Sequence, residues 1–105
     1  MKTSELIDKA ADKLDASPWF RGSYTPNDYN SRCVLTSFSG LVGGTTSETL
    51  QYSDAKLALQ RAIKELYGLE NAAIAYWNDC AAESKEQAVD MMRYAAKLAR
   101  MGEEE

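Results

Sequence analysis

The chain opens with apolar and charged positions that alternate with the period of an α-helix. Over residues 3–16, apolar side chains recur every three or four positions, and charged side chains fall between them. Thr3 or Ser4 can cap the start, and Pro18 follows the end. The pattern predicts an amphipathic helix whose buried face consists of Leu6, Ile7, Ala10, Ala11 and Leu14.

Two later segments have the same helical period. In residues 53–67, Ser53 or Asp54 can serve as the N-cap. The segment ends before Gly68, a residue type that commonly terminates helices. Their predicted buried stripe consists of Ala55, Leu59, Ala62, Ile63, Leu66 and Tyr67. Ser84-Lys85-Glu86-Gln87 matches a capping box and predicts a last helix that runs to about Met101. The apolar face of that helix is predicted to carry Ala88, Met91, Met92, Ala95, Leu98 and Ala99.

The connecting segments are less regular. Residues 17–32 hold four aromatic side chains, and we expect Trp19 to fold back onto the core. Residues 32–42 suit a short buried helix, with a β-strand as the alternative, and the glycines at 43–44 end either one. Residues 69–80 predict a further short helix that stops at Asn78.

These elements predict an all-α protein. We expect a compact single-domain bundle of about four helices, with an aromatic-rich loop after the first helix. A chain of 105 residues has room for one core. The helical domain is predicted to span residues 1–102, and residues 103–105 are predicted to form an acidic tail.

The charge balance narrows the classes of partner. With 16 acidic and 12 basic residues, the net charge is −4, and the chain lacks the basic footprint of a nucleic-acid binder. No segment approaches the ~20 apolar residues that span a bilayer. The first residues carry an acid where a signal peptide needs an apolar run. We therefore predict a cytoplasmic protein that binds neither nucleic acid nor membrane.

The chain offers little for catalysis. It has no histidine, which removes the commonest general base and metal ligand, and its two cysteines form no C-x-x-C pair. Cys33 lies in an apolar run, which favours a small core residue over a nucleophile. The glycines at 40, 43 and 44 lack the lysine of a P-loop. We predict no metal and no cofactor, and a non-catalytic role leads over an enzyme that uses Cys33 or Asp79.

The most particular short sequence is Trp77-Asn78-Asp79. In the structural interpretation, Trp77 anchors the core, while Asn78 and Asp79 end one helix and turn toward the next. In the functional interpretation, the polar pair lies beside the indole at the rim of a pocket. If the two tryptophan segments meet, a ligand site would consist of Trp19, Tyr24, Trp77, Asn78 and Asp79.

Several of these pieces occur together in a characteristic order. They are Ala10-Ala11, then Trp19, Gly22 and Tyr24, then Cys33-Val34-Leu35-Thr36-Ser37-Phe38, then Ile74-Ala75-Tyr76-Trp77-Asn78-Asp79, and finally Ala95-Ala96. In this the chain resembles a family of small proteins of unknown function from actinobacteria and their phages. Members of that family carry a tryptophan, a glycine and an aromatic residue, a C-A-L-G-A-L-like helix and an I-x-x-W-N-D element. The chain departs from the pattern at Phe20, where many members have cysteine.

The resemblance implies a phage or actinobacterial origin and supplies no activity. Our leading interpretation is a non-catalytic protein-interaction domain, a phage accessory or host-modulating protein with a protein partner. Aromatic side chains in a loop-rich region favour this interpretation, because such residues are enriched at interface hot spots. The alternative is a small-ligand binding module with its pocket near Trp19 and residues 77–79. The pattern leaves a homodimer open as well.

Overall fold

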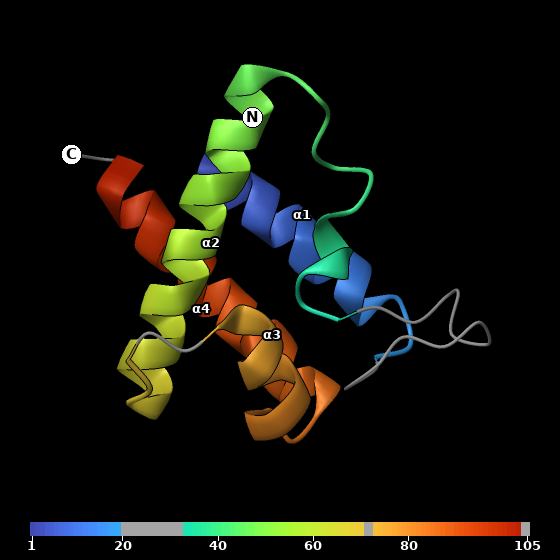
Figure 1. Ribbon diagram of the computed structural model, residues 1–105, viewed down its shortest axis with the longest axis vertical. Coiled ribbons are helices and arrows are strands. Elements are labelled where there is room, and N and C mark those ends of the chain that lie inside the picture. The colour runs from blue at the N-terminus through green and yellow to red at the C-terminus, as the bar shows by residue number, and fades with distance from the viewer. Residues whose placement is uncertain (20–32, 71–72, 104–105) are drawn as a thin grey trace.

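The predicted all-α fold is confirmed by a computed structural model that describes residues 1–19, 33–70 and 73–103. Their helical elements are α1 (Thr3–Asp15), η2 (Thr36–Phe38), α2 (Thr46–Tyr67), α3 (Ile74–Tyr76), η3 (Trp77–Ala81) and α4 (Lys85–Glu103). In the view of Figure 1, α2 runs down the front, α1 and α4 lie behind it, and α3 lies near its lower end. The core forms where α1, α2 and α4 pack together.

The first helix matches the predicted periodicity. All five apolar positions predicted for its inner face are buried. Neither Thr3 nor Ser4 caps it, however; the N-cap is Lys2, which makes no side-chain cap hydrogen bond. Ser4 is inside the first turn, and it donates from its backbone N–H to Glu103 Oε1 (2.9 Å) and from its hydroxyl to Oε2 (2.7 Å). A carboxylate from the other end of the described chain therefore satisfies one of the free backbone donors at the start of α1.

Glu103, which was predicted to open an acidic tail, is the last residue of α4. Burial raises the pKa of Glu103, but the two hydrogen bonds from Ser4 outweigh this effect, with help from the charges of Lys2 and Arg100, and the net pKa is lowered. Ion pairs also join the two helices, because Arg100 contacts Asp8 at 2.8 Å and Arg93 contacts the same carboxylate at 3.3 Å.

The second long helix begins seven residues before the predicted start at Ser53. Thr45 is the N-cap, and its hydroxyl oxygen accepts from the backbone N–H of Glu48 at 3.1 Å. The Glu48 carboxylate in turn accepts from the Thr45 hydroxyl (2.7 Å) and from the Gly43 N–H (2.6 Å). The predicted start was wrong because the polar stretch before Ser53 contains a T-x-x-E capping box. The predicted terminator is confirmed, since Gly68 adopts a left-handed φ of 72°.

The capping carboxylate gives α2 a pH dependence. The pKa of Glu48 is lowered, first by the Thr45 hydroxyl and then by the Gly43 N–H. The stabilisation is therefore complete above the ordinary glutamate pKa of about 4.3, and it is lost as the pH falls through the lower pKa of the folded state. We expect the thermal midpoint of the native protein to fall over that acidic range, and to fall less in Glu48→Gln.

Thermal unfolding followed by circular dichroism across acidic pH tests this. Glu65→Gln, on the same helix but far from its start, is the matched control and should follow the native profile. Parallel profiles for the native protein and Glu48→Gln would contradict the assignment.

The described part of the segment before α2 forms a helix rather than the alternative strand, but the helix is much shorter than the predicted range of 32–42. A single 3₁₀ turn, η2, buries Ser37 and Phe38. It ends because Ser39 is extended (ψ 131°) and Gly40 has a φ of 82°, a conformation that favours glycine. Small residues and a left-handed turn thus end the helix early, although the apolar side chains are spaced as in a longer one.

The helix predicted to stop at Asn78 continues for three more residues. After α3, the chain widens into the π turn η3, in which the Ala82 N–H donates to the Trp77 carbonyl at 2.8 Å. Two consecutive side chains of this turn, Trp77 and Asn78, are both buried. Single π turns are rare, so the spacing of the apolar residues could not predict one here.

The last helix starts as predicted, because the Ser84 hydroxyl accepts from the Gln87 N–H at 3.1 Å. The Gln87 side chain reaches back one residue further than in the standard box, to the N–H of Glu83 (2.6 Å). The predicted inner face is buried except for Ala99, which is half-buried. On α2, by contrast, Leu66 was wrongly assigned to the core: it is exposed. Across the described ranges, no helix is long and apolar enough to cross a membrane.

Candidate functional site

The two tryptophan segments meet at the side chain of Asn78, which was the condition for the ligand site considered from the sequence. Asn78 is 1% exposed. Its Oδ1 accepts from the Trp19 indole N–H at 2.9 Å and from the Val34 backbone N–H at 3.3 Å. Its Nδ2 donates to Asp79 Oδ1 at 2.9 Å. The structure therefore brings together four of the five candidate residues, and Tyr24 lies outside the described residues.

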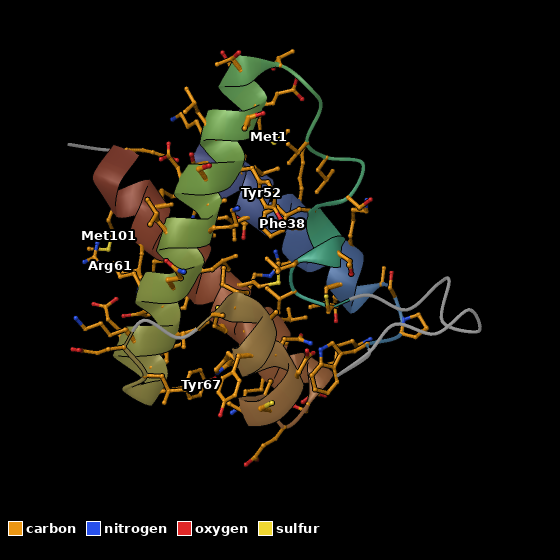
Figure 2. The ribbon with its side chains drawn as sticks, in the orientation of Figure 1. Met1, Phe38, Tyr52, Arg61, Tyr67 and Met101 are labelled. Atoms are coloured by element: carbon orange, nitrogen blue, oxygen red, sulfur yellow. The ribbon has the colours of Figure 1, made fainter. Side chains whose placement is uncertain are left out.

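Trp77 packs into the core. Its side chain is fully buried, and its ring lies against Tyr67 with centroids 5.3 Å apart and planes at 39°. Tyr67 extends from the lower end of α2 toward α3 (Figure 2). Burial is the main cause that raises the pKa of the Tyr67 phenol. This tilted aromatic pair fixes α3 and η3 against α2.

In this position, the side-chain amide of Asn78 joins separate segments of the chain through hydrogen bonds. A carboxamide oxygen has two lone pairs, and both accept hydrogen bonds from within the protein, one from Trp19 and one from Val34. The amide thereby holds three separate stretches of chain, those around Trp19, Val34 and α3–η3. The residues proposed from the sequence as a ligand site thus include Trp19 and Asn78, which are joined by a hydrogen bond within the protein.

A hollow of about 360 Å³ lies elsewhere, and its lining consists of Leu35, Phe38, Ser39, Gly40, Val42 and Tyr52. Phe38 and Tyr52 lie together between η2 and α2 (Figure 2), with ring centroids 5.3 Å apart. Burial, and secondarily the Cys33 thiol, raises the pKa of Tyr52. This lining does not include the candidate residues of η3, so the hollow is separate from the tryptophan cluster. Among the described residues, no group of three or more cysteine or carboxylate side chains is placed to hold a metal ion.

A second surface feature, which the sequence analysis missed, runs along the outer face of α2. Leu50 is 61% exposed and Leu57 is 63% exposed. They are seven residues apart, and Asp54 and Arg61 occupy the four- and eleven-residue positions, so all four share one helix face. We call Leu50, Asp54, Leu57 and Arg61 the α2 strip. The signal was this spacing, which was hidden because the predicted helix began after Leu50.

The α2 strip borders an open groove between α2 and α4. One hollow of about 230 Å³ is lined by Thr3, Asp54, Ala58, Ala99, Gly102 and Glu103. A second hollow, of about 200 Å³, is lined by Leu57, Ala58, Arg61, Leu98 and Ala99. The two share Ala58 and Ala99, whose small side chains leave the groove open. Arg61 and the 55% exposed Met101 lie along the same edge of the molecule (Figure 2).

The comparison with known families assigns the chain. A family model described as a family of unknown function, DUF6197, matches residues 1–98. The chain belongs to DUF6197. The match includes the Asn78 cluster, the whole of α2 and most of α4, so the Asn78 cluster and the α2 strip lie within the matched residues. No curated protein and no solved structure matches the chain. Membership of a family of unknown function, expected from the resemblance, is thereby confirmed.

Proposed function

We propose that this DUF6197 protein is a non-catalytic protein-interaction domain that binds through the α2 strip and the adjoining groove. The observation that carries the proposal is the exposure of two large leucines on one helix face, beside a groove floored by Ala58 and Ala99. Exposed apolar side chains gathered on one face, with polar residues among them, are typical of protein contact sites.

The geometry of this surface suits a helical or flat protein partner. Leu57 projects beside the groove, and small residues on the groove floor can receive an apolar side chain from the partner. Asp54 and Arg61 supply one charge of each sign next to it, which can fix orientation. In the interpretation that follows from the family resemblance, the protein is a phage accessory or host-modulating protein in the cytoplasm.

The alternative, a small-ligand site at Trp19 and residues 77–79, has less support. The Asn78 oxygen that would orient a ligand already accepts two hydrogen bonds from the protein, and Trp77 is fully buried. These contacts favour a structural role for the cluster.

Site-specific photo-cross-linking in the cells that make the protein tests the proposal. A photo-reactive residue in place of Leu57 should give adducts heavier by the mass of a protein. The same residue in place of Gln60, also exposed on α2 but off the strip, is the matched control and should give at least about tenfold less adduct, the ratio expected for a hot spot against its surroundings. Equal adduct patterns from the two positions would contradict the proposal.

A further inference from the structure

We infer that the α2 strip binds a second copy of this chain, with the two α2 helices antiparallel about a two-fold axis near Leu57 and Ala58. This inference rests on the proposed function, since it names the occupant of the same surface. Two features of the strip support it: the order of its charges and the match between its projecting leucine and its groove.

The charges of the α2 strip are self-complementary in one orientation. Asp54 lies three residues before Leu57, and Arg61 lies three residues after Ala58. An antiparallel pair centred between Leu57 and Ala58 therefore places each Asp54 opposite the Arg61 of the other copy. A parallel pair would place Asp54 against Asp54 and Arg61 against Arg61, so like-charge repulsion opposes it.

The existing contacts of Arg61 allow this pairing. Its Nε lies 3.7 Å from Glu65 Oε2, and its side chain is 64% exposed. A guanidinium has five N–H donors in a planar fork, so it can hold Glu65 on its own helix and Asp54 of the other copy at once. Asp54 borders the groove and is exposed, which places its carboxylate at the same surface.

The shape of the surface also supports a two-fold pairing. Each copy offers a projecting Leu57 and, directly beside it, the hollow of about 200 Å³ floored by Ala58, Leu98 and Ala99. A two-fold axis near Leu57 lets the leucine of each copy enter the hollow of the other, which is the self-matching contact that two-fold dimers require. Burial of Leu57 from each copy removes one of the two exposed leucines of each strip from water.

Analytical ultracentrifugation of the purified chain at high micromolar concentration tests the inference. The native protein should sediment as a dimer. Leu57→Glu should raise the dimer dissociation constant by at least about tenfold, whereas Gln60→Glu should leave it within about twofold. A native protein that stays monomeric, or a dimer that Leu57→Glu leaves intact, would overturn the inference.

A charge-swap mixture tests whether the charges of the two α2 strips face each other. Asp54→Arg carries two positive charges on the strip, and Arg61→Asp carries two negative ones, so each alone should be monomeric. Mixed in equal amounts, they should form a heterodimer, because every cross-pair is then one arginine with one aspartate. A mixture that sediments no differently from its components overturns the charge contact between the two α2 strips, while circular dichroism confirms that each variant is folded.

The outcomes separate this inference from the proposed function. If the native chain is monomeric but the photo-reactive residue at Leu57 captures a different protein in cells, self-association fails and the interaction role stands. If the residue at Leu57 gives no excess of adducts over the one at Gln60 and the chain is monomeric, both fail.

Discussion

Replacement of Trp77 by alanine should lower the free energy of unfolding by about 3–5 kcal/mol, the range for deletion of a fully buried tryptophan. The side chain has no exposed surface, and it packs on Tyr67 at 5.3 Å between ring centroids. Its removal leaves a cavity between α2 and η3 that the surrounding helices cannot fill without repacking. Urea unfolding followed by far-ultraviolet circular dichroism measures the change.

The adjacent residue provides the matched control. Tyr76 is 59% exposed, so Tyr76→Ala should change the unfolding free energy by no more than about 0.5 kcal/mol. Trp77→Phe, which keeps an aromatic ring against Tyr67, should lie between the two and keeps the test open if the alanine variant does not fold. Similar losses for Trp77→Ala and Tyr76→Ala would refute the view that Trp77 anchors the core.

The second large effect is expected at Asn78. Asn78→Ala leaves the buried N–H of Val34 and the Trp19 indole N–H without their acceptor. Each unsatisfied donor costs about 1–3 kcal/mol, so we expect a total loss of about 2–6 kcal/mol in the free energy of unfolding. The Val34 donor is the more costly of the two, because that hydrogen bond is buried and the Trp19 bond is partly buried.

A double-mutant cycle isolates the link between the two tryptophan segments. Trp19→Phe removes the indole N–H and keeps a ring, so in its presence Asn78→Ala leaves one donor fewer unsatisfied. The two changes together should therefore cost less than their sum, by about 1 kcal/mol. Full additivity in urea unfolding would show that the 2.9 Å hydrogen bond contributes nothing to stability.

The sequence predicted the helices where a local signal was strong and periodic. The face of α1, the stop at Gly68 and the Ser84 cap each depend on residues within one or two turns, and each is confirmed. The start of α2 was also encoded locally, in Thr45 and Glu48, but the polar stretch was interpreted as a connection. That error was one of interpretation and hid the α2 strip.

Other features depend on contacts between distant parts of the chain. The Glu103 carboxylate at the start of α1 could not be predicted from either end alone, since no local pattern links residues 99 positions apart. The buried side chains of Trp77 and Asn78 contact partners from three other segments, at Tyr67, Trp19 and Val34. For the candidate site, the sequence identified Trp19, Trp77, Asn78 and Asp79 as neighbours, but only the geometry shows the Asn78 oxygen fully used inside the protein.

The packing of the first helix against the last has a consequence for synthesis on the ribosome. The main partner of α1 in the described structure is α4, so much of the apolar face of α1 stays uncovered until residues 85–103 have been made and have left the exit tunnel. Closure of so long a loop is slower than folding between neighbouring helices. During that interval, the nascent chain exposes an apolar face that chaperones recognise and that can aggregate, although each helix itself forms from neighbouring residues.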